Sequence, residues 1–242
     1  GYKAAGIHCG IRKNKSKKDL SLIISEKPAS AAAVYTTNLV KGAPLLVTKK
    51  HISNGVAQAI ICNSGNANTC NSNGIEIAEQ TCKLVAEALQ MDKDDIVVAS
   101  TGVIGQPLPI EPIITAAPKL AEGLSYDGNL RAATAIMTTD TVKKEVAVGF
   151  SLGGKNCRLG GMAKGSGMIC PNMATTLNFI TTDAAISRDM LQKALDEITK
   201  ITYNCLSVDG DTSTNDMVCV LADGLCKNAE ITSPGADFDS FK

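Results

Sequence analysis

The chain alternates short segments rich in Val, Ile or Thr with longer segments of helical periodicity, and this alternation restricts the fold more than any other feature. The short segments are bounded by Gly, Asn or Asp, which predicts strands at 20–25, 57–63, 96–100, 145–150, 175–181 and 217–222. Apolar residues recur every three or four positions in the longer segments, which predicts helices at 74–90 and 187–201, with a weaker pattern at 110–120 and 129–137. We therefore expect an α/β or α+β fold in which helices pack on a mixed sheet.

Size and charge exclude several classes of protein. A compact chain of 242 residues buries roughly 70 to 75% of the surface that it exposes when unfolded, so its fold needs no disulfide or metal. Its 24 basic and 24 acidic side chains balance to a net charge of +0, which supplies no broad attraction for phosphate backbones or anionic membranes. The apolar runs fall far below the roughly 18 residues that a membrane span needs. We expect neither a nucleic acid nor a membrane as a partner.

The cysteines, 9 in all, are widely spaced and mostly lie in apolar surroundings. Structural disulfides are typical of oxidising compartments, and a zinc site usually shows paired cysteines at short spacing, a pattern that this sequence lacks. We interpret these residues as reduced members of the core and expect a cytoplasmic protein.

Gly, Ser, Thr and Asn gather where the predicted strands end. The clusters are 63–74, 100–105, 138–141, 160–176 and 209–216. Loops carried on a rigid scaffold often hold binding and catalytic residues. The pattern therefore predicts loops that converge on one site.

Counting and spacing exclude several kinds of chemistry at that site. Only His8 and His51 are available, so a Ser/His/Asp or Cys/His triad would have to recruit one of them, and we interpret both as structural or exposed residues. The stretch 160–166 fails as a phosphate loop because Lys164 precedes Gly165, whereas a Walker-type loop has Gly, Lys and then Ser or Thr. A GxGxxG motif between a strand and a helix, the dinucleotide fingerprint, is also missing.

Metal binding fits little better. The segment 209–215 carries oxygen ligands at alternate positions, as a calcium loop does. Thr214 occupies the place of the sharp-turn Gly, however, and Val220 the place of the final Glu. We interpret the segment as a turn with capping side chains, and expect no metal and no other cofactor.

A hydroxyl nucleophile that needs no imidazole remains open. A threonine can use its own α-amino group as the base, because the reference pKa of that group, about 7.7 to 8.0, leaves a usable neutral fraction. Such a threonine must be freed by self-cleavage, in which its hydroxyl attacks the preceding carbonyl. Thr175 follows the small residue Ala174 at the start of a predicted strand. An Ala-Thr pair at a strand start is common, so the pair is one candidate.

The segment 164–175 reads Lys-Gly-Ser-Gly-Met-Ile-Cys-Pro-Asn-Met-Ala-Thr. It resembles the self-cleavage loop of the ornithine acetyltransferase family, also called glutamate N-acetyltransferases or arginine biosynthesis bifunctional proteins. Members of that family are made as a precursor and cut before the threonine. Other segments match in the same order along the chain: 3–10, 63–68, 100–105, 137–141 and 207–216.

The resemblance implies a role for each matching residue. Thr175 would be the nucleophile, acetylated on its hydroxyl after cleavage between Ala174 and Thr175. Thr101 and Gly102 match the pair that forms the oxyanion hole, and loss of one such donor commonly costs about a hundred- to a thousandfold in rate. Thr138 and Lys164 match positions that contact the substrate. Lysine also suits an amino-acid α-carboxylate on chemical grounds alone.

The implied reaction moves the acetyl group of N-acetylornithine to Thr175 and then to L-glutamate. Some members also accept acetyl-CoA as a donor. The implied fold layers helices on stacked mixed sheets in an αββα manner. Residues 1–174 would be the α fragment and residues 175–242 the start of the β fragment, with the C-terminal part of the usual family chain outside this sequence. The two fragments associate, often into a heterotetramer.

Two other functions stay open from the sequence. Related self-cleaved threonine enzymes act as aminopeptidases or amidases, because one fold hosts several chemistries. A non-catalytic amino-acid-binding fragment is the other alternative. Thr176 also stands where the family usually has Met, and it offers a second hydroxyl beside Thr175.

Overall fold

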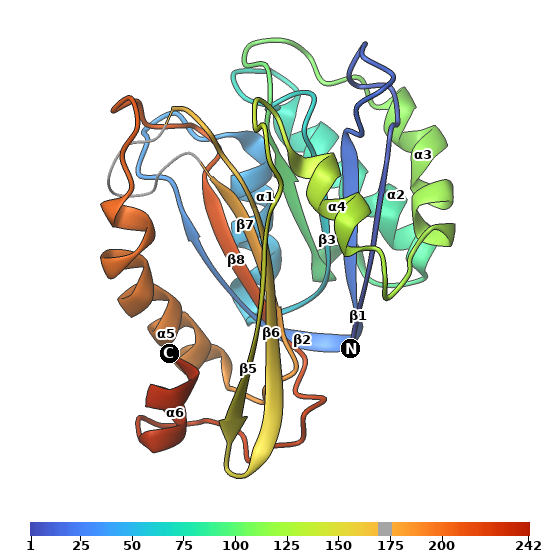
Figure 1. Ribbon diagram of the computed structural model, residues 1–242. Coiled ribbons are helices and arrows are strands. Elements are labelled where there is room, and N and C mark those ends of the chain that lie inside the picture. The colour runs from blue at the N-terminus through green and yellow to red at the C-terminus, as the bar shows by residue number, and fades with distance from the viewer. Residues whose placement is uncertain (169–175) are drawn as a thin grey trace.

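The computed structural model describes residues 1–168 and 176–242 and contains all the predicted strands and helices (Figure 1). The strands are β1 (Tyr2–Ile7), β2 (Leu20–Tyr35), β3 (Val56–Asn63), β4 (Ile96–Ser100), β5 (Lys144–Leu152), β6 (Lys155–Lys164), β7 (Leu177–Thr182) and β8 (Met217–Ala222). The α-helices are α1 (Ala43–His51), α2 (Gly74–Leu89), α3 (Glu111–Glu122), α4 (Asn129–Ile136), α5 (Arg188–Ile201) and α6 (Ala236–Phe241). The mixed α/β class predicted from the sequence is confirmed.

The strands form one mixed sheet in the order β4-β3-β2-β8-β7-β6-β5, and β1 pairs with β2 beside this path. The pairs β3/β4 and β7/β8 are parallel, and the remaining pairs are antiparallel. Within each parallel pair, the two strands begin side by side and end side by side.

Strand β2 belongs to both halves of the sheet. Its first part pairs with β1 and β3, and its last part, from Ser30 to Tyr35, pairs with β8. The register with β3 shifts between Ile24 and Ala29, on either side of Pro28. A β-bulge tolerates a proline because the ladder is already interrupted there. The sequence prediction ended this strand at Ser25, short of its observed end at Tyr35.

The two halves of the sheet share one hydrophobic core. Ile60 of β3, Phe179 of β7 and Cys219 of β8 lie in the same buried cluster. Helices α2 and α3 cover the outer face of the half that contains β3 and β4, and helices α5 and α6 cover the outer face of the half that contains β8. In Figure 1 these helix pairs lie on opposite sides of the molecule with the strands between them. This arrangement agrees with the αββα layering that the family resemblance implied.

The covering helices follow from their apolar spacing. Ala78, Cys82 and Val85 recur along α2 and pack on the outer face of β3 and β4. Leu191 and Ala194 do the same on α5. Both helices appear at the places that the periodicity predicted, to within a residue or two.

Four elements lie outside the sequence prediction. β1 and β6 contain Ala, Gly, Lys and Arg in place of the usual β-branched residues. α1 has no clear apolar face, but it begins with Pro44 in its first turn and ends with basic residues that favour a helix C-terminus. α6 is short, with 6 residues.

None of the helices in the described part of the chain combines the length and the apolar composition that a membrane span needs.

The shared core gives a first prediction. Phe179 is 1% exposed and packs between the two halves of the sheet. We expect Phe179→Ala to lower the free energy of unfolding by about 3 to 5 kcal/mol in a urea titration, because it removes buried contacts and leaves a cavity. Val148 on β5 is 49% exposed, so Val148→Ala is the control and should cost less than about 0.5 kcal/mol. Equal losses in the two variants would contradict the shared core.

Candidate active site

The described residues of the five polar clusters predicted from the sequence are joined by hydrogen bonds at one end of the sheet. Asn215 joins three of them, because its amide nitrogen donates to the carbonyl of Ala67 at 2.7 Å and to the carbonyl of Ser100 at 2.9 Å. Lys164 connects the cluster 160–176 to this group, because its Nζ donates to the Thr101 hydroxyl. Asp140 connects the cluster 138–141, because its carboxylate accepts from the Gly165 N–H. Segments far apart in the sequence thus form one continuous network of hydrogen bonds.

Hydrogen bonds to the end of β3 fix the start of the loop that follows β4. The backbone N–H of Thr101 donates to the carbonyl of Asn63 at 2.9 Å, and the side chain of Asn63 donates to the Ser100 hydroxyl at 2.7 Å. The next residue, Gly102, has a φ of +133°. A Cβ atom there would lie 2.6 Å from the carbonyl carbon of Gly65. Only glycine allows this backbone approach.

Gly102 leaves a donor free in this tight loop. The residue is exposed, and its backbone N–H makes no hydrogen bond to another described residue. A fixed backbone N–H without a protein partner can stabilise a developing negative charge. This geometry suits the oxyanion role that the resemblance implied for Gly102.

Lys164 ends β6 and lies inside the site. Its side chain is 4% exposed, so it is not a solvated loop lysine, and its Nζ donates to the hydroxyl oxygen of Thr101 at 3.3 Å. Burial lowers the pKa of Lys164, while the negative charges of Asp140 and Asp216 oppose this shift. Because Lys164 donates to the Thr101 oxygen, the Thr101 hydroxyl proton stays available for another acceptor.

Asp140 holds the loop before β5 against the end of β6. One carboxylate oxygen accepts from Lys144 Nζ at 2.7 Å and from the backbone N–H of Gly165 at 2.8 Å, and the other accepts from the Thr138 N–H at 3.1 Å. Burial works to raise the pKa of Asp140, but these bonds outweigh it, so the pKa lies below its ordinary value. Asp140 is therefore ionised at neutral pH and fixes Thr138 beside the loop that follows Lys164.

Asp216 has a different environment in the same site. Its side chain is buried, and its Oδ2 has no hydrogen-bond partner among the described residues. Burial raises the pKa of Asp216 to about 7, although Ser213, Lys164 and the backbone of Thr176 act in the opposite direction. The site thus holds one carboxyl group that changes its protonation near neutral pH.

Comparison with known proteins identifies the family of the chain. The model of the ArgJ family matches residues 3–242. This chain belongs to the ArgJ family. It is 48% identical over 242 residues to the arginine biosynthesis bifunctional protein ArgJ of Caldanaerobacter subterraneus, an alignment that covers all of this chain and 60% of that protein. The chain therefore spans about three fifths of the length of the curated relatives it matches.

Two solved ArgJ-family structures resemble the chain. The arginine biosynthesis bifunctional protein argJ of Bacillus halodurans has a TM-score of 0.66 and 42% identity, over 71% of this chain and 90% of that one. The ornithine acetyltransferase of Mycobacterium tuberculosis, solved in complex with ornithine, has a TM-score of 0.62 and 33% identity, over 71% of this chain and 91% of that one.

The predicted site residues of this ArgJ-family chain fall into two groups. Thr101, Gly102, Thr138 and Lys164 lie in the connected loops described above. Ala174 and Thr175, which flank the predicted cleavage bond, lie outside the described residues. Thr176 is buried, and its hydroxyl oxygen accepts from the Asn178 side chain at 2.6 Å.

The sequence analysis did not predict Asp140 and Asp216 as individual site residues. It included them only within the segments 137–141 and 207–216, which resemble the family. Asp140 and Asp216 carry the charges around Lys164. A signal was present for both, because each lies in a polar cluster beside a predicted strand. Choosing them among their neighbours requires the positions of the loops relative to Lys164.

Both histidines contact other parts of the chain. His8 Nδ1 lies 2.9 Å from the carbonyl oxygen of Lys17 and 3.5 Å from Asp19. His51 Nδ1 lies 2.9 Å from the carbonyl oxygen of Ile96, at the opposite end of β4 from Thr101. Its Nε2 is 3.4 Å from both Glu79 and Asp94, a grouping that could bind a metal, but Lys50 and Lys93 already pair with Glu79. The charges balance there without a metal ion.

The segment 209–215 serves the loops, as its interpretation as a turn predicts. Asp209 accepts from the backbone N–H groups of Met168 and Asp211, and the buried Asn215 bridges neighbouring loops.

Asp216 gives a prediction about pH. Its folded-state pKa of about 7 lies above the ordinary value of 3.8, so the folded state holds this proton more tightly than the unfolded state. The resulting stability is present below about pH 4 and is lost as the pH rises toward 8. We expect the stability of the unmodified chain relative to Asp216→Asn to fall by up to about 4 kcal/mol over this range, as measured by urea titrations at each pH. Parallel curves for the two proteins would exclude this proton uptake.

Proposed function

We propose that this ArgJ-family chain carries the acetyl-transferring site of an enzyme that moves the acetyl group of N-acetylornithine to L-glutamate through an acetyl-Thr175 intermediate. The observation that carries the proposal is the buried Lys164, whose Nζ contacts the Thr101 hydroxyl. The next residue, Gly102, has a backbone N–H with no hydrogen-bond partner among the described residues. The position of Thr175 in the sequence supports the proposal, since Thr175 precedes Leu177 by two residues and Leu177 pairs with Lys164.

Self-cleavage prepares the nucleophile in this proposal. The Thr175 hydroxyl oxygen attacks the Ala174 carbonyl carbon, the peptide C–N bond breaks, and water then hydrolyses the ester that results. This releases the α-amino group of Thr175 beside its own hydroxyl. A free α-amino group has a pKa near neutrality, so it can accept the hydroxyl proton in the transfer reaction.

The transfer then takes place in two steps, acetylation of Thr175 and transfer of the acetyl group to glutamate. The Thr175 oxygen attacks the acetyl carbonyl carbon of N-acetylornithine, the C–N bond breaks, and the ornithine amine leaves with the proton that the α-amino group had taken. The amine of glutamate then attacks the acetyl carbonyl carbon and the ester C–O bond breaks. The proton that the glutamate amine loses passes through the α-amino group to the Thr175 oxygen, which restores the hydroxyl. The Thr101 hydroxyl and the Gly102 N–H stabilise the negative oxygen in both steps.

Lys164 and Thr138 position the amino acid in this scheme. Ornithine and glutamate share an α-carboxylate, and a buried ammonium binds such a group more strongly than an exposed one because less water competes. Asp140 keeps the loop of Thr138 next to this ammonium. Acetyl-CoA as a second donor, a cytoplasmic location and assembly of the fragments into a heterotetramer remain predictions from the family resemblance.

Cleavage and acetylation of Thr175 provide the direct test. Mass spectrometry of purified protein should find fragments that part between Ala174 and Thr175, and a mass increase of one acetyl group on the Thr175 fragment after incubation with N-acetylornithine. Thr175→Ala should remain uncut. Thr176→Ser is the matched control and should be cut and acetylated, because its hydroxyl keeps the bond from Asn178.

The alternatives give different results in the same assays. A cut chain that hydrolyses peptides or amides faster than it acetylates glutamate would favour an aminopeptidase or amidase. An uncut chain that binds amino acids without acetylation would favour a binding fragment. Acetylation of Thr176 in place of Thr175 would overturn the assignment of the nucleophile.

Lys164 gives a second test of the proposal. Lys164→Met removes the ammonium but keeps much of the side-chain volume, and we expect kcat/KM for glutamate to fall roughly 10- to 100-fold, the loss of one charged hydrogen bond. Lys155 lies on the same strand but is exposed, so Lys155→Met is the control and should leave kcat/KM unchanged. An unchanged kcat/KM in Lys164→Met would exclude Lys164 from the binding of glutamate.

A further inference from the structure

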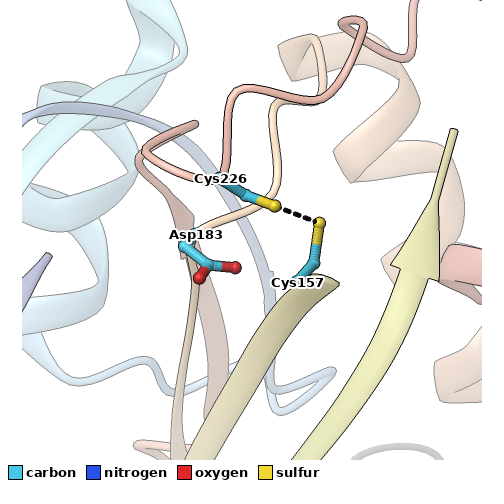
Figure 2. A group of neighbouring side chains, drawn as sticks. All are labelled: Cys157, Asp183 and Cys226. Atoms are coloured by element: carbon cyan, nitrogen blue, oxygen red, sulfur yellow. Dashed lines mark hydrogen bonds between the residues drawn. The ribbon is translucent and has the colours of Figure 1, made fainter. Parts of the chain in front are cut away.

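A pair of cysteines lies away from the proposed active site. Cys157 is on β6 and Cys226 follows β8, and their Sγ atoms are 2.8 Å apart although 69 residues separate them in the sequence. Figure 2 shows the two sulfur atoms pointing toward each other, with Asp183 beside them. Cys157 is buried and Cys226 is partly exposed.

The distance between the sulfur atoms favours a covalent bond over a metal site. Two thiolates on one tetrahedral zinc ion, with Zn–S bonds of about 2.3 Å, would lie about 3.8 Å apart. The separation of 2.8 Å is shorter than this and closer to the roughly 2.05 Å of a disulfide. A small shift of either side chain would therefore complete an S–S bond.

The neighbouring polar groups already have partners. One oxygen of Asp183 accepts from the backbone N–H of Arg158 at 2.7 Å, and the Asn228 oxygen accepts from the Ala185 N–H at 2.7 Å. The backbone carbonyl of Asp183 also accepts from the Cys226 N–H at 2.8 Å, which fixes the position of Cys226. The thiols have weak polar contacts besides each other, from Cys157 Sγ to the Asn228 oxygen at 3.8 Å and from Cys226 Sγ to the Asn156 carbonyl at 3.3 Å. Both contacts are longer than the 2.8 Å between the two sulfur atoms.

We infer that Cys157 and Cys226 form a reversible disulfide when the protein meets a low-molecular-weight disulfide such as oxidised glutathione. Cys226 loses its proton to water, and its sulfur attacks one sulfur of the small disulfide and releases one small thiolate. The Cys157 sulfur, after losing its proton to water, attacks the sulfur of Cys226 and releases the second small thiolate. The two cysteines are oxidised, and the small disulfide is reduced to two thiols.

The order of attack follows from the environments of the thiols. Cys226 is the sulfur that solvent can reach, so it reacts first with the small disulfide. Burial raises the pKa of the Cys157 thiol, and the negative charge of Asp183 adds to this shift. The second step needs the Cys157 thiolate, so it becomes faster as the pH rises.

The cross-link would have a further consequence that rests on the proposed self-cleavage. Cys157 lies in the predicted α fragment, 1–174, and Cys226 lies in the predicted β fragment, 175–242. A disulfide between them would join the two products of the cut covalently. Reduction would then leave them associated only through packing and hydrogen bonds.

Peptide mapping tests the disulfide. The purified chain is incubated with oxidised glutathione, its remaining thiols are alkylated, and it is digested without reductant. We expect a linked peptide that contains Cys157 and Cys226, its loss on treatment with dithiothreitol, and a rise in Tm of roughly 5 °C or more, because the cross-link closes a long loop. On gels, cut protein should run as one band without reductant and as two bands with it.

The variants separate the possible outcomes. Cys226→Ser and Cys157→Ser should lose the linked peptide and the rise in Tm, whereas Cys205→Ser, at an exposed cysteine outside the pair, should keep both. Unlinked thiols in oxidised protein, or zinc retained by the pair, would overturn the inference. An uncut chain that still gives the linked peptide would contradict the proposed self-cleavage but not the disulfide.

Discussion

The burial of one lysine ammonium sets the conditions for the whole site. Removing an unpaired charge from water costs several kcal/mol, so Lys164 depends on polar groups that the surrounding loops bring to it. Thr101 supplies a hydroxyl oxygen, and Asp140 and Asp216 supply negative charge. These residues come from different loops, and each loop must be in place before the cation can be buried. The convergence of the loops and the burial of the charge are therefore energetically coupled.

The two carboxyl groups near Lys164 differ because their hydrogen bonds differ. Asp140 accepts three bonds, from Lys144, Gly165 and Thr138, and stays ionised. Asp216 is buried with one oxygen unpartnered among the described residues, and its pKa rises to about 7. Pairs of carboxyl groups whose environments separate their pKa values are typical of sites that bind or transfer protons. The site combines a constant negative charge with one that varies around neutral pH.

Most strands and helices could be predicted from the sequence, but their contacts in the site could not. Periodicity identified α2 and α5, and composition identified β4 and β8, because these elements bury one or both faces and carry the pattern that burial requires. β6 was missed because its residues 155–164 include two glycines, a lysine at each end and few β-branched residues, and its neighbours in the sheet stabilise it. Local sequence does not contain that information.

The same limit applies to individual side chains. The loop clusters could be predicted because polar residues gather at strand ends, and the matching segments named Thr101 and Lys164. The contact between these two depends on where β4 and β6 end relative to each other, which the strand order decides. The proximity of Cys157 and Cys226 depends on the same order, because β6 and β8 lie on either side of β7.

The strand order also explains how the chain could tolerate a cut between Ala174 and Thr175. β7 and β8 follow the proposed cut in sequence, yet β7 pairs with β6 and β8 pairs with β2, both of which precede it. The second fragment thus forms the centre of the sheet, with strands of the first fragment on both sides. Separating the fragments would break two strand ladders and expose the core around Phe179. A peptide bond at this position can therefore be lost without loss of the fold, because the sheet itself holds the two fragments together.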